Sequence, residues 1–270
     1  MRLDRPPTLA AFLAAAESFL VQHEAEHGLM LAVAAQPAPP DAYWALVRDG
    51  NDGAVVGAGL RNTSKLILSR ESVPGAMALL AADAMQPQVD SVIGPRRSLN
   101  AFAAASGRAW RSGHQHRIYE CRAVVPPAST AGSRRIAGPE DRELLVDWTQ
   151  AFRSEALGEL LTRDEAAGIA DRHLGSGGMH VWTVDGEVVT CAAAVGPTPR
   201  GIRIGGVYTP PEHRRHGYAS ALVAEMTQLY LDAGREFVFL YADRDNPTSN
   251  GVYQRIGYRS VAEAVDLLLV

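Results

Sequence analysis

The residues best suited to chemistry lie between Arg214 and Ser220, where a short basic run meets a glycine and the start of a helix. Arg214, Arg215 and His216 supply positive charge, and Gly217 lets the backbone approach a ligand closely because it has no Cβ. A helix that begins here leaves its first N–H groups unpaired at its positive dipole end, which suits a pyrophosphate. The stretch is not a P-loop, because no Gly-Lys-Ser/Thr follows. It is not a dinucleotide fingerprint either, because the Gly-x-Gly-x-x-Gly spacing is absent.

A second polar segment follows further along the chain. Asp243 to Tyr258 reads Asp-Arg-Asp-Asn-Pro-Thr-Ser-Asn-Gly-Val-Tyr-Gln-Arg-Ile-Gly-Tyr. Arg214-x-x-Gly217-x-Ala219 resembles the Arg/Gln-x-x-Gly-x-Gly/Ala signature of the GCN5-related N-acetyltransferase (GNAT) family. The second segment is similar to that family's Asn-x-x-Ser-x-x-x-Tyr-x-x-x-Gly-Phe/Tyr segment, at the family's usual distance. The resemblance covers about the last half of the chain, and the chain as a whole resembles the two-domain bacterial predicted acetyltransferases with a degenerate N-terminal half.

The resemblance implies that acetyl-CoA, or a close acyl-CoA, is the acyl donor. The backbone of Val207, Tyr208 and Thr209 would pair with the extended pantetheine arm. The pyrophosphate would lie against the basic loop and the first residues of the helix, namely Arg214, Arg215, His216, Gly217, Tyr218, Ala219 and Ser220. Asn246 lies near the pantetheine by family position, although an asparagine before Pro247 is also a favourable helix N-cap.

Tyr253 is the residue that we expect to act in catalysis, because the resemblance places it on the helix that reaches the thioester. An amine attacks the thioester carbonyl, and the CoA thiolate must leave. A phenol with a pKa of about 10 can protonate a thiolate whose conjugate acid has a pKa of about 8.5 or somewhat above, given positioning. The competing interpretation is an aromatic core residue beside Ile256 and Tyr258.

The base that deprotonates the attacking amine is not evident from the sequence. Many members of the family carry a glutamate on the strand before the phosphate loop, but Ile202 to Tyr208 contains none. Glu155, on a predicted helix, could border the acceptor site, although we favour the interpretation of an ordinary solvated helix residue. A water chain is the alternative. No motif identifies the small-molecule or peptide amine that would accept the acyl group.

We therefore interpret the chain as an acetyl-CoA-dependent N-acetyltransferase that acts by direct attack in a ternary complex, without a metal. The alternative is a non-catalytic acyl-CoA-binding regulatory module that retains the phosphate loop. A third interpretation is a zinc hydrolase, because His23-Glu24-Ala25-Glu26-His27 satisfies His-Glu-x-x-His. We disfavour it, since Gly28 is expected to end the helix and no third-ligand pattern follows.

Composition and charge exclude several classes of protein. The chain has 26 Lys and Arg against 30 Asp and Glu, so no broad surface for nucleic acid or membrane lipid is implied. The apolar N-terminal residues follow a helical stripe interrupted by Glu17, unlike the continuous block of a signal peptide. Cys121 and Cys191 lie in apolar strand-like runs, as expected of buried reduced thiols in a cytoplasmic protein. Nothing in the sequence indicates the oligomeric state.

The element pattern predicts an α/β (α+β) fold with a mixed, mostly antiparallel sheet flanked by helices, in two tandem GNAT-like domains. The second half reads as two helices, a hairpin about Asp185-Gly186, a strand over 201–208, a helix from Tyr218, a strand over 236–242, a helix and two closing strands. The first half shows a similar order.

The first half lacks the Arg-x-x-Gly-x-Ala spacing and the tyrosine. We interpret it as a degenerate copy that does not bind the cofactor, with an unrelated α+β packing domain as the alternative. The small, proline-bearing stretch 126–133 is typical of a linker. The predicted domains are therefore 1–127, a degenerate GNAT-like domain, and 134–270, the catalytic domain.

Overall fold

The structure is a computed structural model of the chain, and it describes residues 1–62, 65–84 and 89–270. Contacts divide it into two compact units. Unit 1 joins Met1–Ile118 to Val261–Val270, and unit 2 is Tyr119–Ser260. The sequence-based division kept 134–270 together, whereas contacts place Val261–Val270 in unit 1 because that segment pairs with a strand there.

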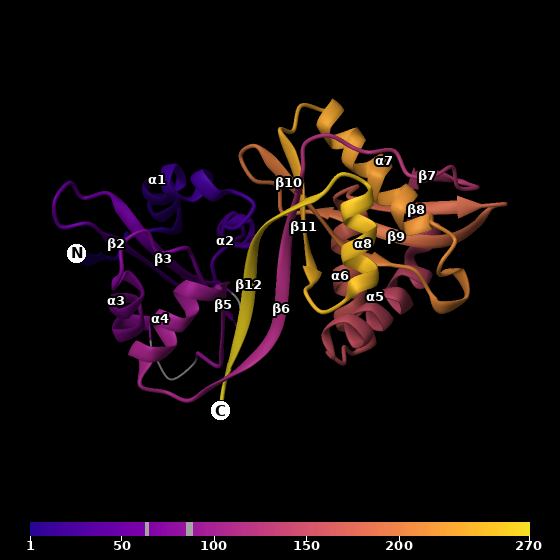
Figure 1. The fold of residues 1–270 in the computed structure, drawn as a ribbon. Helices are drawn as coiled ribbons and strands as arrows, with labels where there is room; N and C mark the ends of the chain where they lie inside the picture. The colour runs from indigo at the N-terminus through magenta and orange to yellow at the C-terminus, as the bar shows by residue number, and fades with distance from the viewer. Residues whose placement is uncertain (63–64, 85–88) are drawn as a thin grey trace. The chain divides into compact units, whose positions relative to one another are not determined.

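Unit 1 is a sheet with helices on both faces (Figure 1). Its strands β1 to β5 lie in numerical order, and all neighbours are antiparallel except β4 and β5, which are parallel. Alternate residues of β2 face opposite layers, since Ala45 packs with α3 and α4 while Leu46 packs with α1 and α2. The elements are β1 (Arg2–Asp4), α1 (Leu9–Leu20), η1 (Val21–His23), α2 (Gly28–Ala34), β2 (Tyr43–Arg48), β3 (Val55–Arg61), β4 (Lys65–Leu68), α3 (Ala76–Ala84), β5 (Ser91–Pro95), α4 (Arg96–Ser106) and β6 (Trp110–Cys121).

Unit 2 repeats this order of elements (Figure 1). Its strand order is β11-β10-β9-β8-β7, with β10 and β11 parallel and the other neighbours antiparallel. Helices α7 and α8 cover one face, around Leu222 and Ile204, and α5 and α6 cover the other, around Val146 and Val181. The elements are β7 (Ser133–Ile136), η2 (Pro139–Asp141), α5 (Arg142–Leu157), α6 (Arg163–Gly175), β8 (Met179–Val184), β9 (Glu187–Val195), β10 (Gly201–Tyr208), η3 (Pro211–His213), α7 (Tyr218–Asp232), β11 (Phe237–Asp243), α8 (Pro247–Arg255) and the first two residues of β12 (Arg259–Leu269).

The predicted fold class, a mixed and mostly antiparallel sheet flanked by helices, is confirmed. The predicted pair of closing strands is instead one strand, β12, which begins in unit 2 and enters unit 1. There it pairs antiparallel with β5, from Ala264 opposite Pro95 to Leu268 opposite Ser91. The strand that follows α8 therefore completes the sheet of the other unit.

The His-Glu-x-x-His sequence does not form a metal-binding helix face. Helix α1 ends at Leu20, and Gly28 begins α2, so the expectation that Gly28 ends the helix is wrong. One ring nitrogen of His27, Nδ1, lies 2.8 Å from the carbonyl oxygen of Leu20, and the other, Nε2, accepts the N–H of Arg70 at 3.1 Å. Burial lowers the pKa of His27 to about 4. His27 is thus a neutral core residue with both nitrogens in use, and the zinc interpretation is contradicted.

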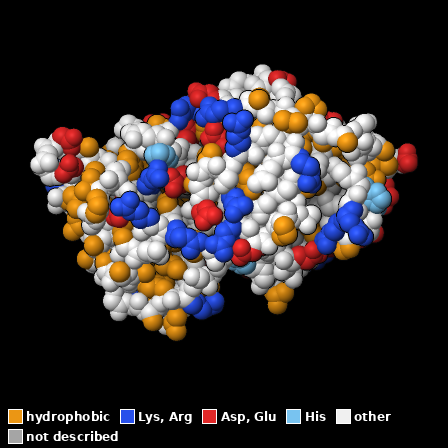
Figure 2. All heavy atoms as spheres, viewed as in Figure 1, with side chains coloured by type: hydrophobic (Ala, Val, Ile, Leu, Met, Phe, Trp, Pro, Cys, Tyr) orange, Lys and Arg blue, Asp and Glu red, His pale blue; other side chains and the backbone are white. Residues whose placement is uncertain are grey.

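The described residues also bear on the expectations for cysteines, metal sites, membrane spans and surface charge. Cys121 and Cys191 are buried and free. Across the described ranges, no group of three or more His, Cys, Asp or Glu side chains is arranged to hold a metal ion. No helix in those ranges combines the length and apolarity needed to cross a membrane. On the face drawn in Figure 2, acidic side chains lie next to many of the basic ones.

Candidate functional site

Strand β10 carries a bulge just before the basic loop. Gly205 lies opposite Ala193 and Tyr208 opposite Cys191, so β10 has one more residue than β9 between these pairs. Gly206, with φ of 59°, absorbs the extra residue in a conformation that favours glycine. Beyond the bulge Tyr208 packs with α5 and α6, while Val207 packs on the opposite face with α7.

The parallel pairing between β10 and β11 is short. It runs over three residue pairs, from Gly201 with Phe237 to Arg203 with Phe239. Strand β10 continues to Tyr208, so its second half presents an edge that is not part of this pairing. Extended amide chains bind to such an edge by adding a strand. Val207, Tyr208 and Thr209, the predicted pantetheine contacts, lie at this edge or directly after it.

The basic loop leads into an open helix N-terminus. Gly217 is the N-cap of α7, with φ of 85°, and it offers no side chain to cap the helix. Among the described residues, no acceptor pairs with the N–H groups of Tyr218, Ala219 or Ser220. These three donors lie at the positive end of the helix dipole, which is where an anion binds most favourably.

Two side chains of the loop are exposed beside these donors. Arg215 has φ of 68°, and no acidic side chain in the described part of the chain pairs with it. His216 stacks on Tyr218, with ring centroids 5.4 Å apart and planes inclined by 20°. The predicted pyrophosphate residues therefore gather at one helix end, with one arginine available for an anion.

Arg214, in contrast, is held by protein groups. Its Nη2 lies 2.6 Å from Oε2 of Glu155, and its Nε donates to the carbonyl oxygen of Thr209 at 2.9 Å. The other carboxylate oxygen of Glu155 accepts the Tyr208 hydroxyl at 3.0 Å. Burial and this hydrogen bond raise the pKa of Tyr208 to about 12. Glu155 thus connects α5 to the end of β10 and to the basic loop.

Tyr253 combines a buried ring with an available hydroxyl. Only 8% of the residue is exposed, and its ring centroid lies 6.2 Å from that of Tyr119 and 6.0 Å from that of Tyr258. No hydrogen bond to its hydroxyl occurs among the described residues, yet the oxygen is not one of the buried polar atoms without a partner. Solvent therefore reaches it. Burial raises the pKa of Tyr253 to about 12, so the phenol is protonated at neutral pH.

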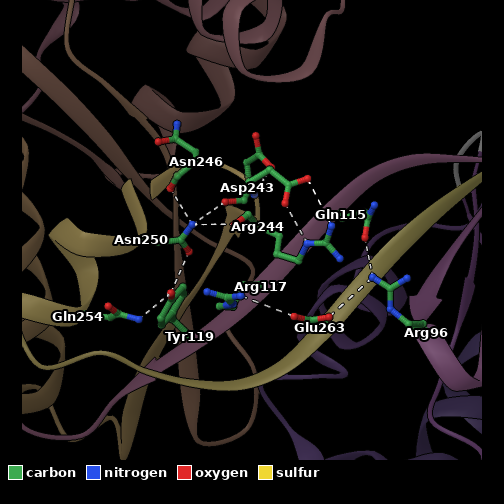
Figure 3. A network of polar contacts seen from close by, with 11 residues as sticks. Arg96, Gln115, Arg117, Tyr119, Asp243, Arg244, Asn246, Asn250, Gln254 and Glu263 are labelled. Carbon is green, nitrogen blue, oxygen red and sulfur yellow. Dashed lines mark hydrogen bonds and ion pairs between the residues drawn. The ribbon is translucent and has the colours of Figure 1, made fainter. Parts of the chain in front are cut away.

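The two asparagines of the second segment have protein partners (Figure 3). The Asn246 side chain accepts the N–H of Ser249 at 3.1 Å, which confirms the N-cap interpretation. Asn250 donates to the carbonyl oxygens of Asp243 and Asn246 at 2.9 and 2.6 Å, and accepts the Tyr119 hydroxyl at 2.8 Å. It is 6% exposed. Asn250 therefore fixes α8 to β11 and β6, and thereby the position of Tyr253 on α8.

Sequence reasoning missed Arg203, a charged side chain in the middle of β10. It lies opposite Val195 and therefore on the face covered by α5 and α6. The signal was present, because Arg203 stands between Ile202 and Ile204 in a strand that is otherwise apolar. A lone charge in such a run needs a partner or a function.

Comparisons with known proteins agree with this geometry. The family model described as "Acetyltransferase (GNAT) family" matches residues 142–258. A GCN5-related N-acetyltransferase from Sphaerobacter thermophilus is 17% identical, with a TM-score of 0.65 over 98% of this chain and 94% of that chain. A GNAT-family acetyltransferase from Colwellia psychrerythraea is 12% identical, with a TM-score of 0.61 over the whole of both chains.

A tandem GNAT protein from the clavulanic acid biosynthesis pathway also shares the fold. It is 16% identical, with a TM-score of 0.56 over 98% of both chains. No curated protein matches the sequence. At such low identities the solved structures establish the fold alone. The family model matches the segment that contains the basic loop and Tyr253. Residues 142–258 therefore match the GNAT acetyltransferase family model, and solved GNAT acetyltransferases share the fold of the chain.

Proposed function

We propose that this protein is an acetyl-CoA-dependent N-acetyltransferase that transfers an acetyl group to a primary amine by direct attack in a ternary complex. The observation that carries the proposal is the open first turn of α7, where three free N–H groups lie beside an arginine without an acidic partner. A pyrophosphate carries the charge and the acceptor oxygens that such a site lacks.

The residues present fit an acyl-CoA along the second half of β10 and the start of α7. Val207, Tyr208 and Thr209 would supply backbone groups to the amides of the pantetheine arm. The pyrophosphate would take the N–H groups of the residues from Gly217 to Ser220 and the charge of Arg215. Arg214 would contribute its backbone, because its side chain already pairs with Glu155. Asn246 would border the arm while its side chain caps α8.

Tyr253 would act as the general acid. Bound acetyl-CoA supplies the acetyl group in activated form, as a thioester. The Tyr253 hydroxyl would give its proton to the departing sulfur, and its raised pKa keeps that proton in place at neutral pH. The hydroxyl has no competing acceptor among the described residues, so it is free to turn toward the leaving group.

The proton of the attacking amine would leave through water. Both carboxylate oxygens of Glu155 are engaged, one by Arg214 and the other by Tyr208. Glu155 therefore holds the phosphate loop in place, and we do not assign it as the base. A water chain at the edge of β10 is the remaining route, since that strand carries no carboxylate.

The experiment that tests this proposal follows thiol release from acetyl-CoA with a panel of primary amines. We expect Tyr253→Phe to lower kcat/KM about 10²-fold or more. Tyr230→Phe is the matched control, because it removes a half-buried hydroxyl from α7, and it should retain the parent rate. A parent protein that binds CoA but turns over no amine would contradict the enzyme and favour the acyl-CoA-binding regulatory module.

Cofactor binding is tested separately by calorimetry. CoA should bind the parent protein, and the Arg215→Glu, Gly217→Val double variant should lose that binding because it adds a negative charge and a branched side chain at the loop. CoA should also raise the melting temperature of the parent, since it binds the folded state. If the parent gives no binding heat, or if the double variant binds as the parent does, the proposed site is wrong.

A further inference from the structure

Arg203 is a cation inside unit 2 without a counter-ion. Its Nε is closed off from solvent and has no hydrogen-bond partner among the described residues. Burial lowers the pKa of its guanidinium, although the residue as a whole is only half-buried. Burying a charge without a partner costs free energy. Such a group in a folded protein is therefore expected to bind a partner from outside the chain.

The other arginines in the same situation show that Arg203 is different. Four arginine Nε atoms in the described ranges are buried without a hydrogen-bond partner. Three of these side chains have a carboxylate within ion-pair distance: Arg61 with Asp41 at 3.3 Å, Arg134 with Glu225 at 3.6 Å, and Arg153 with Glu159 at 2.8 Å. Arg203 has no such carboxylate in that part of the chain.

The groups around Arg203 leave the local charge positive. Its Cζ lies 5.7 Å from the centre of the Tyr241 ring, which can orient a guanidinium but does not neutralise it. His173 of α6 has a pKa lowered by burial and then by the charges of Arg172 and Arg203. Its imidazole has no hydrogen-bond partner among the described residues, so it offers a second polar group at the same place.

Arg203 also lies where β10 and β11 stop pairing. Arg203 and Phe239 form the last pair of the parallel ladder, and the bulge begins two residues further along β10. At about 3.3 Å per residue, the Cα of Arg203 is about 7 to 10 Å from the bulge. Its side chain is on the α5 and α6 face, opposite the face on which Tyr253 packs with α7.

We propose that Arg203 binds the carboxylate of the amine acceptor, so that the substrate class of this enzyme is amino acids or other amines that carry a carboxylate. The inference rests on the proposed N-acetyltransferase function and deepens it. A guanidinium presents a planar pair of donors that matches a carboxylate, and Tyr241 fixes its plane. A monoanionic carboxylate also costs less to desolvate in this half-buried place than a dianionic phosphate does.

The test compares two amines that differ only in the carboxylate, γ-aminobutyrate and propylamine, at saturating acetyl-CoA. We expect kcat/KM for the parent enzyme to favour γ-aminobutyrate about 10²-fold, because propylamine leaves the buried charge unpaired. Arg203→Met should reduce this ratio at least about tenfold, and Arg203→Lys should give an intermediate ratio because it keeps the charge and loses the planar fork. Arg200→Met, at an exposed arginine that pairs with Glu236, is the control and should keep the parent ratio.

A binding measurement separates this inference from the proposed function. Calorimetry with butyrate, which has the carboxylate and no amine, should show binding to the CoA-loaded parent and none to Arg203→Met. Binding of butyrate without turnover of any amine would support the anion site and contradict the transferase. Equal turnover of γ-aminobutyrate and propylamine would support the transferase and overturn this inference. A lower melting temperature of free Arg203→Met, with an unchanged ratio, would show that Arg203 is only structural.

Discussion

Replacing Gly217 by alanine should separate the strain of the phosphate loop from its role in binding. An L-residue at φ of 85° costs about 1–2 kcal/mol. The added Cβ would also come 3.0 Å from Oγ1 of Thr130, which must shift and weaken its hydrogen bond to the carbonyl oxygen of Ala128. That bond contributes about 0.5–1 kcal/mol. We therefore expect Gly217→Ala to lose about 1.5–3 kcal/mol of unfolding free energy.

The matched control lies at the other end of the same helix. Gly234 has φ of 91°, and a Cβ there would meet no atom within 4 Å. Gly234→Ala should lose about 1–2 kcal/mol and bind CoA as the parent does. Gly217→Ala should bind CoA at least about tenfold more weakly, because relief of the strain turns the N–H groups of α7 away from the anion. Urea unfolding and calorimetry measure the two effects. Parent-like CoA affinity in Gly217→Ala would refute this account of the loop.

Three further predictions concern packing and charge. His27 has a folded-state pKa of about 4, below its unfolded value, so its contribution to stability is full above about pH 6.5 and falls as the pH drops toward 4. Between pH 7 and 5 the loss is about 2 kcal/mol, and urea melts of His27→Gln should show a smaller loss than the parent. Asn250→Ala should destabilise the protein by about 3 kcal/mol in the same assay, since the buried Tyr119 hydroxyl loses its acceptor and the carbonyl oxygens of Asp243 and Asn246 each lose a donor; a loss under 1 kcal/mol would contradict this role. Glu155→Gln should lower kcat/KM less than about tenfold, and a loss as large as that of Tyr253→Phe would instead identify Glu155 as the base.

Local signals predicted the strand and the helix on either side of the basic loop well. Pro210 and Pro211 end β10, and a helix does begin at Tyr218 after Gly217. Asn246 caps α8, as the asparagine before Pro247 indicated, and its side chain accepts the N–H of Ser249. Each of these depends on residues a few positions apart, whose backbone preferences are visible in the sequence.

Features that depend on distant residues were not predictable in this way. The sequence shows a strand near 258–270 but not its neighbour, because the apolar alternation of β12 would suit either sheet. Strand β7, at Ser133–Ile136, was not predicted because it is short and polar, and its first residue was assigned to the linker. The role of Asn250 depends on Tyr119, which is far away in the sequence.

Because β12 completes the sheet of unit 1, folding of the first half of the chain depends on the final residues of the chain. While the protein is being synthesised, β5 leaves the ribosome long before its neighbour exists, so its edge stays open until translation ends. A nonsense mutation just before Val261 would spare the phosphate loop and Tyr253, yet it would leave that edge exposed to other nascent chains. Cutting the gene at residues 126–133 would likewise yield a first fragment with an incomplete sheet.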